Sequence, residues 1–515
     1  MKKLLILISL LSFNTHASEE AAEALGERLF NDFRFSAYFA KVSKGNVNHE
    51  LKKGSPAVEV IDTLIGQTTS PFMGKATSCS SCHMVDQGLE IEGLGMRGYN
   101  DAAKRTPIWF RAKDQKTTTL RNTPALIGIN SKYLPHSFVH FDGELDGIKS
   151  TVLGNFTGRN MGWLAFEKEE ALKNVIRVLK EDNGEGELAS EFGGSYRKIL
   201  KGTDPSIEDD FRLSAEYRLD LDTATDEEIL KKVEEYVFIY VKNIDFSTDE
   251  EGNYNGSAYD FFLKENGIPT GPSKNQSVGS YTSGLRRAIA KLDKPRYIEA
   301  FSLDTHGRKT QFKKEELDGL KIFLNLKNNS RSMCLQCHMP PLFSDGLYHN
   351  VGVSQNEYEN IHGKGSLLAK KIPSLKEKEA SKITFLDIPN VKDDNKVDFG
   401  AWNFFSSSKQ SNFSNYMRSL FCSSPANCDD EEISSRMVGR IKTPTLRNLG
   451  HSAPYFHNGS EKDILGVLKV YKRNSELVRN RELVNPAPQL GRMNLKDSDL
   501  KNLEKFIKSL DEEYE

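Results

Sequence analysis

Two pentads decide how this chain folds: Cys79-Ser80-Ser81-Cys82-His83, the first pentad, and Cys334-Leu335-Gln336-Cys337-His338, the second pentad. Cys-x-x-Cys-His is the attachment sequence of a c-type haem. The spacing suits the chemistry, because two thiols add to the two haem vinyl groups and the adjacent imidazole binds the iron. The sequence therefore predicts two covalently bound haem c groups, held by Cys79, Cys82, Cys334 and Cys337, with His83 and His338 as iron ligands.

Two other chemistries use the same residue types. A thioredoxin-like redox pair is expected in a βαβ setting, and neither pentad follows a convincing strand. A zinc site could combine the four cysteines and two histidines, but a long stretch of chain separates the pentads. Haem attachment is the better interpretation.

Composition limits the class of protein. The chain has 515 residues, which is more than one domain usually contains, and 37% of them are hydrophobic, enough for real cores. Lys and Arg number 70 against 72 Asp and Glu, a net charge of −2. This balance gives no basic footprint, so we expect no nucleic-acid partner.

The N-terminus has the pattern of a secretory signal peptide. Lys2 and Lys3 precede the apolar run from Leu4 to Leu11, and Ala17 ends a small-residue cleavage site, so residues 1–17 are predicted to be removed. No later stretch is long and apolar enough to span a membrane. We expect a periplasmic protein, in which Cys422 and Cys428 form a local disulfide.

Helical spacing of apolar residues recurs along the chain. Helices are predicted at 21–30, 169–180, 225–242, 285–301, 314–326, 462–471 and 498–510, with Ser257 capping another. The segment from about 393 to 435 is crowded with Gly, Ser, Asn and Asp and is predicted to be a long irregular loop. The fold class is mostly α.

Several motifs around the pentads resemble the bacterial dihaem cytochrome c peroxidase and MauG family. They are Ala24-Leu-Gly-Glu-Arg-Leu-Phe30, Arg121-Asn-Thr-Pro124, Gly319-Leu-Lys-Ile-Phe323, Tyr348-His-Asn-Val-Gly352, Lys442-Thr-Pro-Thr-Leu-Arg-Asn448 and Ala453-Pro-Tyr-Phe-His-Asn-Gly459. The matches span nearly the whole mature chain, with insertions at about 37–78, 182–275 and 354–438.

The resemblance implies two cytochrome-c-like haem domains with large, partly irregular insertions. We expect an N-terminal, peroxidatic domain over 18–300 and a C-terminal, electron-transfer domain over 301–515 with its loop insertion at about 354–438. By motif position, a calcium ion would be bound by the Asn122 side chain and by the backbone carbonyls of Ser452 and Pro454; oxygen ligands suit this hard cation. An ordinary turn Asn and two loop carbonyls are the alternative.

Tyr471 occupies the position where peroxidases of the family carry a Met ligand to the second haem. MauG-like members resemble this chain in carrying a Tyr at that position. A thioether raises the iron potential, whereas a phenolate favours oxidised iron. The resemblance therefore implies His338 and Tyr471 as the axial ligands of the second haem. The alternative is that Tyr471 packs beside Ile464 and Leu468 on one helix face.

The first haem departs from the family's pattern. No histidine lies between His83 and His136, so the iron of the first haem is expected to be open. Phe141 stands where the family has an electron-relay Trp. Trp163 is only a weak substitute for that Trp. Asn160 falls where a distal Glu is expected. The loss of this Glu removes general acid–base catalysis of O–O bond cleavage, which typically raises a rate 10²–10⁴-fold, unless His136 or His140 supplies it.

Three functions remain open. The first is a periplasmic dihaem oxidoreductase that reacts with hydrogen peroxide at the N-terminal haem and stores or relays electrons through the C-terminal haem. The second is a dihaem electron carrier or sensor without peroxidase turnover. The third is a MauG-like enzyme that oxidises a specific partner protein. The expected partners are peroxide and either a small periplasmic electron donor or a protein substrate, and a homodimer is compatible with the sequence.

Overall fold

The computed structural model describes residues 19–52, 54–55, 57, 60–63, 66–69, 76–84, 97–98, 121–301, 310–424, 428–449 and 452–512. The signal peptide predicted over residues 1–17 lies outside these residues. Within the described residues helices predominate and the strands are few and short, which confirms a mostly α fold.

The chain forms two compact units. The first is Met1–Asp86, Asn100–Thr119 and Gly147–Ile244, and the second is Gln87–Tyr99, Leu120–Asp146 and Asp245–Glu515. Each unit contains one pentad. The haem-domain limits expected from the sequence, 18–300 and 301–515, stay a prediction.

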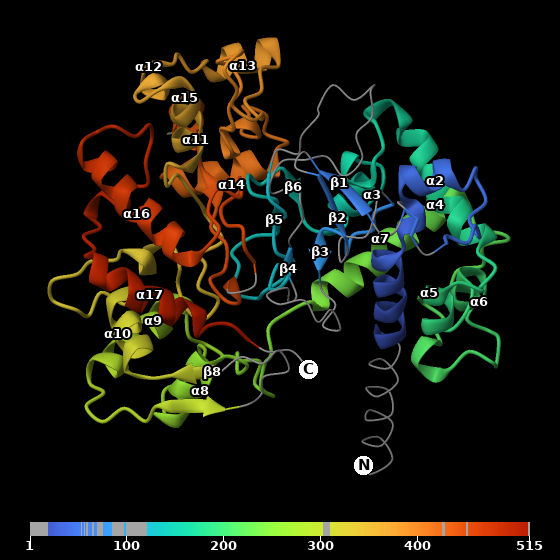
Figure 1. Ribbon diagram of the computed structural model, residues 1–515, viewed down its shortest axis with the longest axis horizontal. Helices are drawn as coiled ribbons and strands as arrows, with labels where there is room; N and C mark the ends of the chain where they lie inside the picture. The colour runs from blue at the N-terminus through green and yellow to red at the C-terminus, as the bar shows by residue number, and fades with distance from the viewer. Residues whose placement is uncertain are drawn as a thin grey trace. The chain divides into compact units, whose positions relative to one another are not determined.

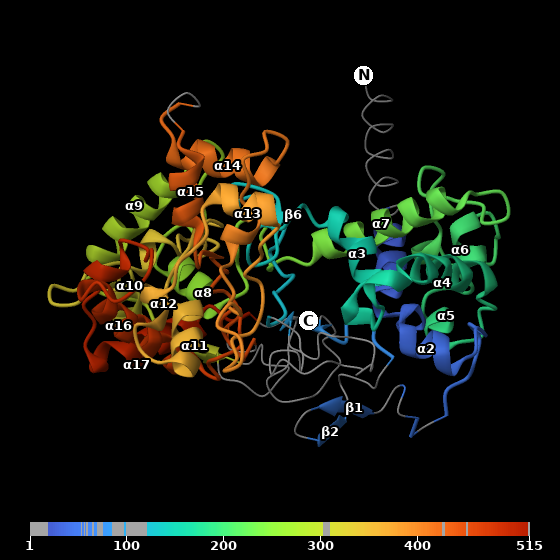
Figure 2. The ribbon, with the colours of Figure 1, turned by 90° about the horizontal axis from the view of Figure 1, so that it is seen from above.

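The first unit is built from helices. Besides a helix over residues 19–31, it contains η1 (Phe33–Phe35), α2 (Ala37–Val42), η3 (Lys149–Thr151), α3 (Val152–Phe156), η4 (Arg159–Met161), η5 (Ala165–Glu167), α4 (Lys168–Glu181), α5 (Glu187–Glu191), α6 (Tyr196–Lys201), η6 (Asp209–Phe211) and α7 (Asp226–Asn243). Its strands are β1 (Val60–Thr63), which pairs antiparallel with β2 (Gly66–Thr69), and β3 (His83–Met84). Helices α3, α4 and α7 pack against one another (Figure 2).

The second unit is larger. Its helices are α8 (Ala258–Glu265), α9 (Val278–Ala290), α10 (Lys314–Phe323), η7 (Cys334–Gln336), α11 (Val353–His362), α12 (Ser366–Ala369), α13 (Leu375–Ser381), η8 (Ala401–Asn403), α14 (Asn412–Phe421), α15 (Asp430–Met437), α16 (Ile464–Arg479), η11 (Leu490–Arg492) and α17 (Asp497–Lys508). Its strands are β4 (Arg97–Gly98), β5 (Phe138–Val139), β6 (Leu145–Asp146), β7 (Ile298–Phe301), β8 (Thr310–Phe312), β9 (Tyr348–His349) and β10 (Ile441–Lys442). Antiparallel pairs form between β5 and β6, β7 and β8, and β9 and β10.

A close helix crossing organises the first unit. Gly26, in the helix over residues 19–31, faces the backbone carbonyl of Tyr236 on α7, and a Cβ there would lie 2.8 Å from the Cβ of Tyr240. One turn later, the Phe30 ring packs edge-on against Tyr240 with centroids 5.2 Å apart. The helix that leads to the first pentad is thereby held against α7.

The second unit repeats this crossing with different helices. Gly319 of α10 faces the backbone carbonyl of Asn502 on α17, and a Cβ there would lie 2.7 Å from the Cβ of Phe506. Phe323, again four residues after the glycine, contacts Phe506 with centroids 5.2 Å apart. Figure 1 shows α10 and α17 side by side. In both units a Gly-x-x-x-Phe pair on the helix before a pentad meets a later helix of its own unit.

Most of the predicted helices are confirmed: 21–30, 169–180, 225–242, 314–326, 462–471 and 498–510 all overlap observed helices, and Ser257 caps α8. The predicted helix at 285–301 is wrong in its second half. Helix α9 ends at Ala290 and β7 begins at Ile298. Pro295 lies between them and is incompatible with a continuous helix, because it lacks a backbone N–H.

The prediction of an irregular loop from about 393 to 435 is also wrong in part. Helices α14 and α15 lie there, capped by Ser411 and Asp429, whose side chains accept hydrogen bonds from backbone N–H groups of the first turn. Phe413 and Met417 of α14 join a separate hydrophobic core of this region together with Trp402. The disulfide predicted between Cys422 and Cys428 is present.

Within the described residues, no helix is long and apolar enough to cross a membrane.

Candidate haem sites

The two pentads fold into the same hydrogen-bonded turn. The His83 N–H donates to the Cys79 carbonyl at 2.8 Å, and the His338 N–H donates to the Cys334 carbonyl at 2.8 Å. The second cysteine of each pentad donates to the first cysteine's carbonyl at 3.1 Å. Each turn therefore presents two thiols and one imidazole in the arrangement that haem attachment needs.

Each turn is fixed by its own unit. The Cys79 N–H donates to the carbonyl of Phe30, the last aromatic residue of the helix that crosses α7, at 3.0 Å. The second turn follows α10, and Ser332 holds its start: the Ser332 hydroxyl donates to the Phe323 carbonyl at 3.1 Å. Both pentads are thus tied to the phenylalanine of the Gly-x-x-x-Phe pair.

His338 is held in the orientation of an iron ligand. Its side chain is buried, and its Nδ1 lies 2.9 Å from the Phe343 carbonyl, to which it donates. A histidine that donates from Nδ1 to a carbonyl presents Nε2 as the metal-binding atom, and its ring cannot rotate freely. Burial lowers the pKa of His338, which keeps the imidazole in the neutral form that a metal needs.

A cavity of about 310 Å³ opens beside the second pentad. Cys334, Cys337 and His338 contribute to its wall, and α16 contributes Ile464, Leu468 and Tyr471. These three residues of α16 follow one another at helical spacing, so they share one face of the helix. The donor set and the largely apolar surroundings fit a haem.

Tyr471 lies near the second pentad, and its assignment as an iron ligand stays a prediction. It lines the cavity and also packs against the hydrophobic core of the second unit. Burial raises the pKa of its phenol, and the pentad cysteines and Asp345 add to that shift. A phenol in this position stays protonated unless a cation compensates for the charge of the phenolate.

Met493 is a cavity residue that the sequence did not single out. It is buried and lines the same cavity as Tyr471 and His338. A thioether is a recognised axial ligand of haem iron. The sequence around Met493 did not indicate a place near the haem, because only the fold brings η11 and Met493, which follows it, to the second pentad.

Burial disfavours the thiolate form of three pentad cysteines. Burial raises the pKa of Cys79 to about 12, that of Cys334 to about 11 and that of Cys337 to about 12. Reactive and metal-binding cysteines need a stabilised thiolate, which here is disfavoured. Among the described residues, none of the four pentad cysteines forms a disulfide.

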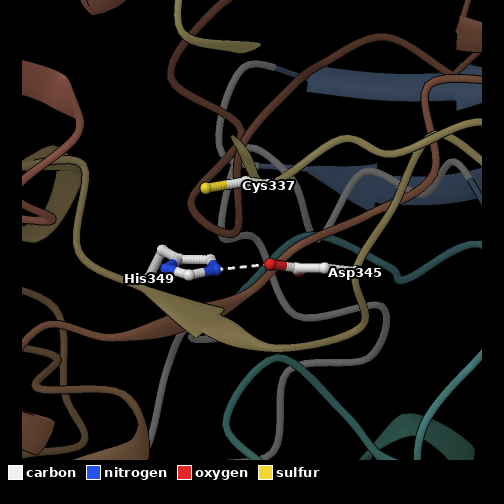
Figure 3. A group of neighbouring side chains, drawn as sticks. All are labelled: Cys337, Asp345 and His349. Atoms are coloured by element: carbon white, nitrogen blue, oxygen red, sulfur yellow. Dashed lines mark hydrogen bonds and ion pairs between the residues drawn. The ribbon is translucent and has the colours of Figure 1, made fainter. Parts of the chain in front are cut away.

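Asp345 and His349 form a pair next to Cys337 (Figure 3). His349 Nε2 lies 2.7 Å from the Asp345 carboxylate. Three atoms that could bind a metal, one each from Cys337 (Sγ), Asp345 and His349, all lie within 4.8 Å of one another. Only the loop that returns from His338 to β9 brings them together. This pair was also missed by the sequence analysis.

The two candidate distal histidines both belong to the second unit. His136 donates from Nε2 to the Gly346 carbonyl at 2.8 Å and accepts the Phe138 N–H at Nδ1, 3.1 Å away. Burial, with the nearby charge of Lys442, lowers the pKa of His136 to about 4. Both of its ring nitrogens are used, so His136 is a structural histidine.

His140 lines the cavity of the second pentad and lies 3.0 Å from the Glu144 carboxylate through its Nδ1. It is partly exposed. Its assignment to distal chemistry at the first haem stays a prediction.

Asn160 lies close in space to the first pentad. The hydroxyl of Thr77, two residues before Cys79, donates to the Asn160 carbonyl at 3.0 Å. The Asn160 side chain is exposed, and its catalytic role stays a prediction. Trp163 is buried, with its indole N–H donating to the Phe35 carbonyl at 3.0 Å, as expected of a core aromatic.

The three predicted calcium ligands are brought to one cavity wall: Asn122, Ser452 and Pro454. The Asn122 amide nitrogen donates to the Pro454 carbonyl at 2.5 Å. This hydrogen bond uses one predicted ligand to satisfy another, so a calcium ion would require the amide to turn its oxygen toward the same place. The calcium site stays a prediction.

A buried charge cluster next to Asn122 was not predicted. Arg121 donates to the Asp398 carboxylate from Nε at 2.6 Å and from Nη2 at 2.8 Å, and also contacts Asp142. Burial alone would raise the pKa of Asp398, but the charge of Arg121 brings it down to about 2. The insertion at 354–438 therefore supplies a carboxylate to the interior of the second unit.

No protein-family model and no curated protein matches the sequence. Among solved structures, the chain is similar to a MauG-like protein associated with microbial copper homeostasis, with a TM-score of 0.44 and 13% identity over 96% of this chain and 90% of that one. It is also similar to the diheme peroxidase BthA from Burkholderia thailandensis, with a TM-score of 0.45 and 15% identity over 95% of this chain and 86% of that one. At such low identity and TM-score, neither similarity assigns a function to this chain.

Proposed function

We propose that the protein is a dihaem c-type oxidoreductase of the cytochrome c peroxidase and MauG type, exported to the periplasm. Hydrogen peroxide reacts at the haem of the first pentad, and the haem of the second pentad stores or relays electrons. One observation carries the proposal: both pentads adopt the same turn, with the histidine N–H bonded to the first cysteine's carbonyl at 2.8 Å in each. The Cys422–Cys428 disulfide is in keeping with an oxidising compartment.

Each residue has a definite part in this proposal. Cys79, Cys82, Cys334 and Cys337 hold the two haems as thioethers, and His83 and His338 bind iron. The Phe343 carbonyl orients His338 through Nδ1. When bound, the haems supply the redox chemistry; the chain orients their ligands and, at the second pentad, surrounds the group with apolar side chains. The electrons come from a small periplasmic donor or from a protein substrate, and the assembly is a monomer or a homodimer.

Calcium is a separate part of the proposal. It would be bound by the Asn122 side-chain oxygen with the carbonyls of Ser452 and Pro454, after the amide is turned. Its support is that the fold brings all three to one wall of the cavity.

Hydrogen peroxide distinguishes an enzyme from an electron carrier. Titration of the oxidised, fully matured protein is expected to change the Soret band of a high-spin haem within seconds, because the sequence between His83 and His136 offers no second histidine to the first iron. The Cys79→Ala/Cys82→Ala variant should lose this response. Two low-spin haems that do not respond to peroxide would contradict the peroxidase proposal and favour the carrier.

Tyr471→Phe tests the proposed ligand of the second haem. If the phenolate binds iron, its loss should change the electron paramagnetic resonance signal of that haem. The midpoint potential should rise by on the order of 100 mV, a fraction of the ~0.8 V range that axial ligands span. Spectroelectrochemical titration measures the potential.

Met493→Leu is the matched control, since Met493 lines the same cavity. We expect it to leave the signal and the potential of the second haem unchanged. A shift in M493L with no shift in Y471F would assign the iron to the thioether and remove the tyrosinate proposal.

A further inference from the structure

Asp345 is fixed in place by hydrogen bonds on three sides. Its backbone N–H donates to the Cys337 carbonyl at 2.7 Å. One carboxylate oxygen accepts the Leu347 N–H at 2.9 Å, and the other lies 2.7 Å from His349 Nε2 (Figure 3). The Asp345 side chain is only 5% exposed. A negative charge is therefore held next to the second pentad with little freedom to move or to be solvated.

The Asp345 carboxylate lies within 4.8 Å of Cys337 Sγ, the sulfur that would attach the second haem. Burial raises the pKa of the Cys337 thiol, and Asp345 adds to that shift. Burial also raises the pKa of Tyr471, with a contribution from Asp345 after those of the two cysteines. At His338, where burial lowers the pKa, Asp345 acts in the opposite direction. The geometry thus places the Asp345 carboxylate directly beside the attachment cysteine Cys337.

We propose that Asp345 is a positioning residue that lowers the reduction potential of the haem at the second pentad, by holding a fixed negative charge next to its Cys337 attachment. The inference rests on the proposed haem function. Ferric haem carries one positive charge more than ferrous haem, so a fixed carboxylate stabilises the oxidised form, and it does so most strongly where water is excluded. His349 serves as the hydrogen-bond partner that keeps the carboxylate turned toward Cys337.

Asp345→Asn tests the proposal, because asparagine has nearly the same shape without the charge. At a fixed electrode potential, the ratio of reduced to oxidised second haem is expected to increase at least tenfold, which is 59 mV for a one-electron couple. Asp345→Ser removes the charge with a smaller side chain and should move the ratio in the same direction. Asp345→Glu keeps the charge and should stay within threefold of the wild type.

Asp499→Asn is the matched control. Asp499 is also a buried carboxylate in the second unit, accepting hydrogen bonds from the Ser330 hydroxyl at 2.7 Å and the Lys496 N–H at 3.0 Å, but it is not part of the group of ligand-type atoms that Asp345 forms with Cys337 and His349. Its variant should leave the ratio within threefold of the wild type. His349→Gln keeps the carboxylate and should not raise the potential.

Several results would overturn the proposal: an unchanged ratio in both D345N and D345S, an equal rise in D499N, or a rise in D345E as large as in D345N. A haem count made on every variant keeps this failure separate from that of the proposed function. A wild-type protein without two attached haems refutes the function itself. Variants that keep two haems but leave the ratio unchanged refute only the role of Asp345.

Discussion

Replacing both Cys334 and Cys337 by Ala is expected to halve the haem bound per chain. The thioether bonds to these two thiols are the only covalent links proposed for the second haem, and the first pentad belongs to the other unit. The pyridine haemochrome assay, with protein quantified independently, should fall from two haems per chain to one. The remaining haem should stay with the protein in acidified acetone, because it is covalently bound. The Cys79→Ala/Cys82→Ala variant should show the same loss at the other pentad.

Cys422→Ala/Cys428→Ala is the control for this prediction. These cysteines form a disulfide within the insertion, and their loss should leave two haems per chain. A loss of both haems in the Cys334→Ala/Cys337→Ala variant, with both kept in the disulfide variant, would show that the two units do not mature independently. A colourless wild type would contradict haem attachment altogether.

The pentads could be recognised from the sequence because their chemistry is local. Five consecutive residues contain both thiols and the imidazole, and the hydrogen bonds that close the turn lie within those residues. The family resemblance implied a place for Tyr471 at the second haem, whereas the helical spacing of Ile464, Leu468 and Tyr471 predicted only a shared helix face. Helix caps such as Thr225 with Glu228 are local in the same way.

The remaining features of the site are made by contacts between distant segments. Asp398 meets Arg121 across a large sequence separation, and Met493 reaches the cavity only because η11 packs against α16. The core around Trp402 escaped detection because its helices are short and embedded in Ser- and Asn-rich sequence. Composition alone made that segment resemble a loop, although it contains the N-cap residues Ser411 and Asp429.

The repeated helix crossing could not be predicted from the sequence either, because it is also made by contacts between distant segments. Gly26 and Gly319 look unremarkable in helical sequences, where glycine is merely an unfavourable residue. Their requirement becomes apparent only when the partner helices are in place, since each faces a backbone carbonyl that cannot move aside as a flexible side chain can.

Gly319→Ala is therefore expected to destabilise the second unit. A Cβ at this position would lie 2.7 Å from the Phe506 Cβ and would overlap the Asn502 carbonyl, so α10 and α17 would have to separate. Overpacking of this kind costs about 1–3 kcal/mol. Alanine regains up to about 1 kcal/mol of helix propensity, but the clash is with backbone, so we expect a net loss of about 1–2 kcal/mol. Calorimetry of the matured protein should show the transition of the second unit at a lower temperature.

Gly284→Ala is the sharpest control for this prediction, because the same substitution should raise the free energy of unfolding at that position. Gly284 lies inside α9 of the same unit, and apart from its chain neighbours and the nearby backbone of α9 no heavy atom lies within 4 Å of the position its Cβ would take. Alanine should then stabilise the helix by about 0.5–1 kcal/mol, and the transition temperature should rise slightly. If both variants shifted the transition in the same direction, α10 and α17 would not approach as closely as the structure shows. A loss confined to Gly319→Ala would instead establish that the helix before the second pentad depends on a glycine at its crossing with α17.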